Sequence, residues 1–391
     1  MTEARIEPGS TLGVLGGGQL GAMFAEAAGR MGYHVAVWDP DPEAPAHRLA
    51  GYSCIAPFSD TAAREAFSKR VRAVTLEWEN VPASLCAWLE EHHRVRPGSL
   101  VLRLIQDRIE QKLFFQSCRL PVPSFTSIDS PGQLGTALAT IGVPAICKTA
   151  TTGYDGKGQW VIGHRSEAEA VQHGLTLTAR AGLRWIVESL VPFERELSVL
   201  VVRDHTGVCQ TYPVVENRHN HGILRLTLAP ASLPPEMVMK AADLARQAVT
   251  ALKGVGVFCV ELFQRADGQL LINEVAPRPH NSGHYTLDAC TVSQFEQQVR
   301  VLCGLPLGEI RMASHAAMVN LIGEELRGMT AGQGYIDLLA IPGAVLHLYG
   351  KRVVRTGRKM GHVTFVADRI ELAEGRAGQF LQRLSSTPVP H

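Results

Sequence analysis

The sequence has almost no net charge, no long hydrophobic run and no paired cysteines. Its 38 Lys and Arg residues balance 37 Asp and Glu, so the net charge of +1 gives no basic excess of the kind that marks a nucleic-acid-binding surface. No run reaches the roughly 18 uncharged apolar residues that span a bilayer, and the first ten residues lack a signal-peptide core. The eight cysteines occur singly, without a C-x-x-C or a zinc-type spacing. We expect no nucleic-acid or membrane partner and a reducing, cytoplasmic location.

A glycine-rich turn near the start joins two short hydrophobic stretches. Residues 11–15 predict a strand, Gly16-Gly-Gly-Gln-Leu-Gly21 predicts a turn into a helix, and residues 35–39 predict a second strand. The glycines and the acid at 39 fit a dinucleotide fingerprint. Gln19 inside the loop and the Pro-Asp-Pro that follows Asp39 fit it poorly. A phosphate or polar ligand, NAD(P), and purely structural glycines are all open here.

A third predicted strand, residues 73–77, is followed by further polar residues. Ligands bind at the carboxyl ends of strands in open α/β sheets, which would place Glu77 and Glu79 at such a site. A helix-capping loop explains both acids nearly as well. The 391 residues exceed what one hydrophobic core holds, and we expect the first domain to close near residue 105.

A lysine ends the next apolar strand, residues 143–148. It is followed by a glycine-containing loop, residues 149–159, and a returning strand. Lys148 on a strand can hold a fixed position against a phosphate, and the loop can supply backbone donors and fold over a ligand. The order differs from Walker A, in which the lysine follows the glycines and begins a helix. The alternative is a strand-end lysine that reaches water.

A possible nucleotide-binding connection follows at residues 184–203. An apolar strand that is broken by Pro192 could seat a flat ring against unpaired backbone groups, and Glu196 could accept hydrogen bonds from sugar hydroxyls. His219 lies in a polar stretch, and its pattern alone indicates a solvated side chain.

Two runs of β-forming residues flank Asp267-Gly268, which predicts a type I′ hairpin turn. If Ala266 pairs with Gln269, Glu261 lies directly opposite Glu274. Like charges opposed on a sheet are destabilising, so the gap calls for a shared proton, a basic side chain or a divalent cation. Mg2+ favours a pair of carboxylates that substrate phosphates complete. The alternative is a solvated hairpin with two ordinary glutamates.

The remaining chain offers two polar segments. Residues 277–284 form a rigid stretch without a hydrophobic period, which is typical of a segment that presents donors. The last ninety residues predict short strands at 315–321, 344–349 and 362–367. Between them, the basic turn at residues 355–359 either anchors a phosphate or is a solvated loop.

The motifs in this order resemble those of the ATP-grasp ligases, and within them the N5-carboxyaminoimidazole ribonucleotide synthetase family. The similar segments are Gly16-Gly-Gly-Gln-Leu-Gly21, Glu77-Trp-Glu-Asn-Val81, Gly153-Tyr-Asp-Gly-Lys-Gly-Gln159, Asn273-Glu-Val-Ala-Pro-Arg-Pro-His-Asn-Ser-Gly-His-Tyr-Thr286 and Arg358-Lys-Met-Gly-His362. The fourteen-residue segment is highly specific. The resemblance runs from residue 13 to residue 362.

The resemblance implies a mixed α/β and α+β fold in three domains. These are a Rossmann-like pre-ATP-grasp domain at 1–106, an ATP-grasp domain at 107–304 with a mobile lid at about 148–215, and a β-rich cap at 305–391. It also implies carboxylation of 5-aminoimidazole ribonucleotide by bicarbonate with ATP and Mg2+, through carboxyphosphate. The implied assembly is a cytoplasmic homodimer with a functional link to a downstream mutase.

The resemblance also assigns roles to individual residues. The implied ATP-binding residues are Arg108, Lys148, Gly153, Tyr154, Asp155, Gly156, Lys157, Gly158, Gln159, Glu188, Ser189, Leu190, Val191, Glu196, His219, Asn273 and Glu274. The implied ribonucleotide- and bicarbonate-binding residues are Gln19, Leu20, Glu77, Tyr154, Asp155, Arg278, His280, Asn281, Ser282, Lys351 and Arg358. Glu261 and Glu274 would hold Mg2+, and the catalytic residues would be Lys148, Arg278 and Asn281.

One departure from the ATP-grasp pattern is Ala276, where many members carry an asparagine, so the ligands of a second Mg2+ stay undefined. The competing functions are another ATP-grasp ligase that acts on a different ribonucleotide or on biotin, an NAD(P) oxidoreductase, and a silent nucleotide sensor. The presence of Lys148, Glu261 and Glu274 disfavours the sensor.

Overall fold

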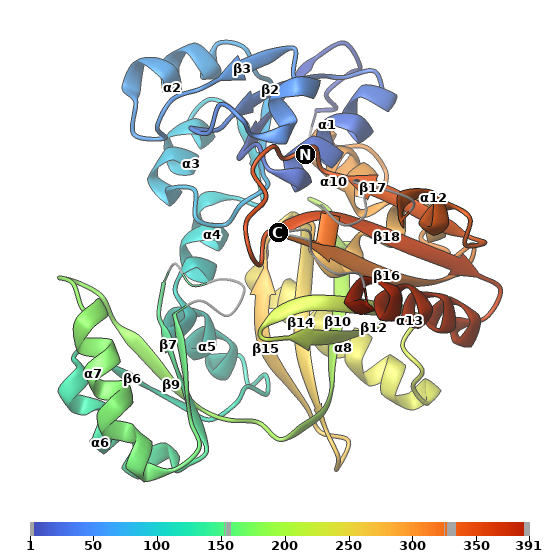
Figure 1. Cartoon of the computed structure of the whole chain (residues 1–391). Helices are drawn as coiled ribbons and strands as arrows, with labels where there is room; N and C mark the ends of the chain where they lie inside the picture. Colours follow the sequence, from blue (N-terminus) through green and yellow to red (C-terminus); the bar gives the residue numbers. More distant parts are fainter. Residues whose placement is uncertain (1–3, 152, 154–157, 324, 327–333, 387–391) are drawn as a thin grey trace.

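The structure is a computed structural model that describes residues 4–151, 153, 158–323, 325–326 and 334–386 (Figure 1). In these residues the strands form three β-sheets, of five, four and nine strands. The predicted α/β and α+β class is confirmed. None of the helices in the described ranges is both long and apolar enough to cross a lipid bilayer.

The N-terminal sheet is parallel, with the strand order β3-β2-β1-β4-β5. Its inner strands are nearly continuous hydrophobic runs because hydrophobic cores lie on both faces. The strand, helix and second strand predicted around the glycine-rich turn are confirmed. The elements are β1 (Thr11–Leu15), α1 (Gln19–Arg30), β2 (His34–Trp38), η1 (Pro45–Leu49), β3 (Tyr52–Cys54), α2 (Thr61–Ser68), β4 (Ala73–Leu76), α3 (Ala83–Glu90), β5 (Arg94–Arg96) and α4 (Ser99–Gln106).

The second sheet is antiparallel, with the order β6-β9-β7-β8. Leu134 of α6 and Leu175 of α7 belong to its hydrophobic core, together with Val187 of β9. The lysine-bearing strand and its returning partner are confirmed as β7 and β8. The elements are α5 (Arg108–Ser117), β6 (Phe125–Ile128), η2 (Pro131–Gln133), α6 (Leu134–Ile141), β7 (Ala145–Thr149), β8 (Gln159–Ile162), η3 (Arg165–Glu167), α7 (Ala168–Thr178) and β9 (Trp185–Ser189).

The third sheet continues from the middle of the chain into its C-terminal part. Its order is β15-β14-β10-β12-β13-β16-β18-β17, with β11 paired to β10. Leu226 of β13 lies opposite Val319 of β16, so the C-terminal strands extend this sheet instead of forming one of their own. The elements up to that junction are β10 (Phe193–Arg203), β11 (Cys209–Thr211), β12 (Val215–Asn220), β13 (Ile223–Ala229), α8 (Pro235–Leu252), β14 (Gly256–Arg265), β15 (Leu270–Ala276), η4 (Asn281–Gly283), α9 (Thr286–Ala289) and α10 (Gln294–Cys303).

The C-terminal part contains a long helix besides the three predicted strands. The elements are β16 (His315–Ile322), α12 (Gly334–Leu339), β17 (Ala344–Leu348), β18 (Lys359–Ala367) and α13 (Ile370–Ser386). Ala373, Ala377 and Phe380 of α13 are buried at helical spacing in the core that β16 and β18 share. The sequence analysis found the strands and missed this helix.

One hydrophobic core joins the first sheet to helix α10. Phe295, Val299 and Leu302 of α10, which follows the third sheet's hairpin, pack in the same cluster as Leu20 and Phe24 of α1. Figure 1 shows α10 beside α1, and the four-stranded sheet lies apart at the lower left. The hairpin end and the glycine-rich turn are therefore held in one rigid arrangement.

Candidate active site

The two glutamates of the hairpin lie opposite each other, as predicted, although the turn differs from the prediction. Arg265 pairs with Gln269, and Gly268 N–H donates to the Arg265 carbonyl at 2.9 Å. Gly268 has a φ of +78°, whereas Asp267 is not in the left-handed region, so the prediction of a type I′ turn with Ala266 opposite Gln269 was wrong. A three-residue loop shifts the register by one.

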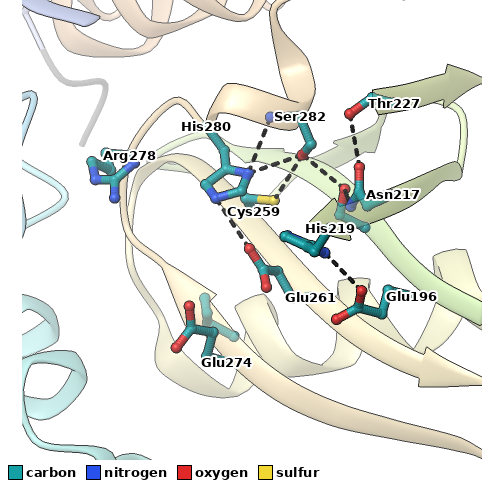
Figure 2. Close-up of polar contacts among 12 residues, drawn as sticks. Glu196, Asn217, His219, Thr227, Cys259, Glu261, Glu274, Arg278, His280 and Ser282 are labelled. Atoms are coloured by element: carbon teal, nitrogen blue, oxygen red, sulfur yellow. Dashed lines mark hydrogen bonds and ion pairs between the residues drawn. The ribbon is translucent and has the colours of Figure 1, made fainter. Parts of the chain in front are cut away.

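A bulge farther along the same hairpin cancels that shift. Leu262 pairs with Ile272 and Glu261 pairs with Glu274, which leaves Asn273 as the extra residue. Figure 2 shows the two carboxylates on the same side of the ribbon. Val260 and Leu262, which flank Glu261 along β14, are buried.

Each carboxylate has a different basic neighbour. Glu261 Oε1 lies 3.1 Å from His280 Nε2, and Glu274 Oε2 lies 3.8 Å from an Arg108 guanidinium nitrogen. Burial alone would raise the pKa of Glu261, but His280, together with the charges of His219 and Lys359, outweighs burial and lowers the pKa to about 2. Glu261 therefore stays ionised, and Glu274, whose side chain is 45% exposed, retains access to solvent.

Two lysines meet one buried glutamate next to this hairpin. Lys148 Nζ on β7 lies 2.9 Å from Glu188 Oε2, and Lys112 Nζ on α5 lies 3.4 Å from Glu188 Oε1. Burial would raise the pKa of Glu188, but the two ammonium groups outweigh it and lower the pKa to about 2. Lys112 also donates to the carbonyl of the bulged Asn273 at 3.0 Å. It thus ties the four-stranded sheet to the carboxylate hairpin.

Arg108 forms a second link between the same two regions. Its guanidinium donates to the Gly153 carbonyl at 2.6 Å and faces Glu274. Arg108 therefore places Gly153 near the hairpin, whereas Gln159 begins β8 opposite Lys148 and the Gly158 carbonyl accepts from Thr149 N–H at 3.0 Å. Tyr154, Asp155, Gly156 and Lys157 lie outside the described residues.

The predicted sugar-binding glutamate is paired with the histidine that the pattern alone placed in solvent. Glu196 Oε2 lies 2.7 Å from His219 Nδ1, and each side chain is 23% exposed. Burial would lower the pKa of His219, but the hydrogen bond and charge of Glu196, together with the charge of Glu261, raise it overall. The expectation of a solvated His219 was wrong because β10 and β12 are neighbouring strands. Ser189 ends β9, and residues 190–192 connect it to β10.

Polar groups after the hairpin point to a site for a second ligand. Arg278 forms a two-point ion pair with Glu79, one arm of which measures 2.8 Å. Asn281 is 7% exposed, yet neither atom of its amide has a hydrogen-bond partner in the described part of the chain. Such a buried amide is costly unless a ligand or water satisfies it. His280 and Ser282 flank it.

The basic residues of the C-terminal part have partners of their own. Lys351 donates to the Lys359 carbonyl at 2.8 Å, and Arg358 donates to the Val353 carbonyl at 2.8 Å. An ammonium group has three donors and a guanidinium group five, so a backbone contact does not use the whole side chain.

The first glycine loop is filled by the protein's own carboxylates. Gly17 N–H donates to Asp39 at 2.6 Å, while Gly18 and Gly21 donate to the two oxygens of Glu77 at 2.9 and 3.1 Å. A Cβ at Gly18 would lie 2.7 Å from the Glu77 carboxylate, so Glu77 itself requires glycine there. The loop therefore has a structural explanation, and Asp39 is not left to bind a ribose.

The geometry of this loop bears on Leu20 and Glu77, both predicted to contact the substrate. Leu20 is 7% exposed in the core of α1, so its side chain does not face a ligand, which corrects the prediction for that side chain. Burial raises the pKa of Glu77, against the two backbone donors. Gln19 begins α1 and is partly exposed.

Comparisons with known proteins match this arrangement along the chain. The ribonucleotide synthetase preATP-grasp domain matches residues 10–106, the ATP-grasp domain matches 113–295, and the phosphoribosylaminoimidazole carboxylase C-terminal domain matches 316–376. The N5-carboxyaminoimidazole ribonucleotide synthase of Bacillus subtilis (strain 168) is 40% identical over 370 residues, which cover 94% of each chain. The chain belongs to the N5-carboxyaminoimidazole ribonucleotide synthase family.

Solved structures agree with this membership. An ADP complex of an N5-carboxyaminoimidazole ribonucleotide synthetase has a TM-score of 0.92 and 39% identity, and covers 99% of this chain and 100% of its own. The Aspergillus clavatus enzyme in complex with ADP and 5-aminoimidazole ribonucleotide has a TM-score of 0.87 and 30% identity, and covers 98% and 100%. The fold is therefore an ATP-grasp fold with a preATP-grasp domain, and the chain is an ATP-dependent ligase of purine biosynthesis.

Sequence reasoning missed Lys112, which lies 3.4 Å from Glu188. The signal was present, because Lys112 is spaced three residues from both Ile109 and Phe115, on the buried face of α5. A lysine on an apolar helix face predicts a buried counter-charge.

Proposed function

We propose that this chain carboxylates 5-aminoimidazole ribonucleotide with bicarbonate and ATP, and that it does so between the carboxylate hairpin and the polar segment that follows it. The observation that carries the proposal is the pairing of Glu261 with Glu274 across β14 and β15, with Lys148 held at a buried anchor nearby. A pair of carboxylates and a fixed ammonium group suit a metal-bound triphosphate. The names and contents of the related structures support the choice of substrate.

The hairpin fits Mg2+ because it offers oxygen ligands alone. Glu261 is ionised, and Glu274 lies 3.8 Å from Arg108, beyond a hydrogen bond, so its carboxylate is available. Glu261 and Glu274 would hold the ion, and Ala276 leaves a second ion without the usual amide ligand. When bound, Mg2+ neutralises charge on the transferring phosphoryl group.

The nucleotide would lie between the four-stranded sheet and the hairpin. Lys148 would contact the terminal phosphates, Arg108 would hold the base of the glycine loop against them, and Glu196 would accept hydrogen bonds from the ribose. The connection at residues 189–191 would bind the purine through its backbone. In this proposal residues 148–215 act as a lid on the ATP-grasp domain.

Bicarbonate and the ribonucleotide would lie on the Asn281 side. A bicarbonate oxygen attacks the γ-phosphorus, ADP leaves, and carboxyphosphate forms. The exocyclic amine then attacks the carboxyl carbon, phosphate leaves, and the amine loses a proton. Arg278 would hold the carboxyl group after exchanging part of its contact with Glu79, and the unpartnered Asn281 amide would bind the same group or the imidazole.

The ribonucleotide's phosphate would contact Lys351 and Arg358. Both side chains are partly exposed and can add a phosphate to their present backbone contacts. Gln19, at the start of α1 and partly exposed, would contact the ribonucleotide from the first sheet's side. We also propose a cytoplasmic homodimer with a functional link to the downstream mutase; the eight free cysteines are consistent with a reducing compartment.

The test is ADP release measured with each substrate omitted in turn. We expect release to require ATP, bicarbonate and 5-aminoimidazole ribonucleotide together. ADP release with glycinamide ribonucleotide or biotin in place of aminoimidazole ribonucleotide would show that the protein catalyses a different ATP-grasp reaction. An absorbance change of NAD(P)H without ATP turnover would refute the ligase mechanism.

A further inference from the structure

A chain of buried hydrogen bonds leads from the interior of the nine-stranded sheet to the metal-type carboxylates (Figure 2). Its links are Thr227 to Asn217 at 2.9 Å, Asn217 to Ser198 at 2.9 Å, Ser198 to Ser282 at 2.8 Å, Ser282 to His280 at 2.9 Å, and His280 to Glu261 at 3.1 Å. The first three residues were not among the predicted site residues.

The register of the strands lines these residues up. Ser198 on β10 lies directly opposite Glu261 on β14, and Asn217 on β12 lies directly opposite Thr227 on β13. Thr227, Asn217 and Ser198 are at most 5% exposed. Buried polar side chains are tolerated only when they are satisfied, and here they satisfy one another.

The donors along the chain run in one direction. The Ser282 backbone N–H, which can only donate, points to His280 Nδ1 at 3.3 Å, so in the neutral imidazole Nδ1 is the acceptor and the single ring proton is on Nε2. The Ser282 hydroxyl also faces Nδ1 and gives its single proton to it. Ser282 must then accept from Ser198.

Because each hydroxyl has one proton to donate, the direction of the remaining hydrogen bonds is also determined. Ser198 has used its proton on Ser282, so it accepts from the Asn217 amide N–H, whose carbonyl oxygen accepts from Thr227. Every hydroxyl proton in the chain is thereby assigned. The result at the other end is a His280 Nε2–H that is directed at Glu261.

We propose that Ser198, Asn217 and Thr227 are positioning residues that hold His280 in the tautomer with its proton on Nε2. This inference rests on the proposed function, in which His280 lies beside bicarbonate and the carboxyl group that it becomes. The opposite tautomer would present a lone pair to Glu261 and to an anionic substrate. The row of hydrogen bonds from Thr227 to Ser282 instead makes His280 a hydrogen-bond donor to those oxygens.

The variants that test this are Ser198→Ala and Thr227→Val, which each delete one hydroxyl and little volume. We expect kcat for ADP release to fall by about 10- to 100-fold, as for other residues that orient a functional histidine, with KM for ATP unchanged. Ser198→Thr and Thr227→Ser restore the hydroxyl and should recover most of the rate. The matched control is Thr364→Val, on β18 of the same sheet, whose buried hydroxyl has no partner in the described residues.

A spectroscopic measurement separates positioning from general loss of structure. In protein with 15N-labelled histidine, the two ring nitrogens of His280 give the pattern of its tautomer, and a His280→Asn variant identifies its signals. We expect the Nε2–H pattern in the unaltered chain and a mixed or inverted pattern in Thr227→Val. In the His280→Asn background, Ser198→Ala should cause no further loss of rate.

Three outcomes overturn the proposal: an Nδ1–H pattern in the unaltered chain, the same pattern in all variants, or kcat within about twofold of wild type in both hydroxyl deletions. Failure of the unaltered chain to release ADP with bicarbonate and the ribonucleotide is a different result. It would refute the proposed function, while the tautomer measurement would still decide whether the hydrogen-bond chain fixes His280.

Discussion

Replacing Lys112 with methionine tests the central ion cluster most directly. Lys112 is 3% exposed and shares the buried Glu188 with Lys148. The pKa of Glu188 is about 2 against an ordinary 4.5, which corresponds to about 3 kcal/mol in favour of its charged form. Removing one partner of a buried pair typically costs about 3–5 kcal/mol. Because Lys148 remains at 2.9 Å, we expect K112M to cost the lower value, about 3 kcal/mol.

The assay is equilibrium unfolding in urea, followed by tryptophan fluorescence. Trp185 is buried on β9, three residues before Glu188, and reports on the four-stranded sheet. The matched control is Lys240→Met, which breaks an exposed i,i+4 pair with Glu236 and should leave the unfolding midpoint essentially unchanged, because solvent screens an exposed pair. The double variant K112M/E188Q removes one charge of each sign and should be about 1–3 kcal/mol more stable than the sum of the single losses predicts.

The pH dependence supplies an independent check. The folded pKa of Glu188 is depressed, so its stabilisation is complete above pH 4.5 and is lost as the pH falls towards 2. K112M raises that pKa, and the loss then begins at a higher pH. A K112M chain that is as stable as wild type, with the same acid profile, would refute the role assigned to Lys112.

Three further predictions follow from the site and the buried groups. Glu274→Gln should abolish ATP turnover while circular dichroism shows an unchanged fold; wild-type rates at saturating Mg2+ would contradict its assignment. Burial lowers the pKa of His284 and His362 well below the ordinary value, so only the unfolded state takes up their protons below about pH 6.5. Stability should then fall by up to about 1.4 kcal/mol per pH unit for each imidazole, and His284→Gln should flatten that slope in a pH series of unfolding curves. Gly18→Ala should destabilise by about 1–3 kcal/mol because its Cβ meets Glu77 at 2.7 Å, whereas Gly29→Ala on α1, with open space around it, should be neutral or stabilising by thermal unfolding.

The sequence predicts those parts of the candidate site that depend on residues close together along the chain. A predicted two-residue turn placed Glu261 opposite Glu274, and the strand that ends near Lys148 was predicted from its apolar run and the glycines after it. The pairing of the two glutamates was correct, although the register from which it was predicted was wrong. A three-residue turn and a bulge at Asn273 each shift the register by one, and the two shifts cancel.

The parts that the sequence does not predict depend on contacts between distant segments. Nothing near His219 in the sequence indicates Glu196, because the two meet only when β12 lies beside β10. Likewise, α10 packs on α1 across more than 260 residues, and β16 joins β13. By contrast, α13 could have been predicted from the sequence, because its apolar residues recur every three to four positions.

The junction of β13 with β16 has a mechanical consequence. One uninterrupted ladder of interstrand hydrogen bonds connects the hairpin of Glu261 with β18, whose first residue adjoins Arg358. Hydrogen-bonded strands therefore fix the distance between the two hairpin carboxylates and the basic turn, the two ends of the proposed ribonucleotide site. No strand in the described ranges bonds this nine-stranded sheet to the four-stranded sheet. Besides the chain connection from β9 to β10, Lys112 and Arg108 link the two sheets through side-chain contacts, and in the proposed mechanism an opening that admits ATP would change these contacts.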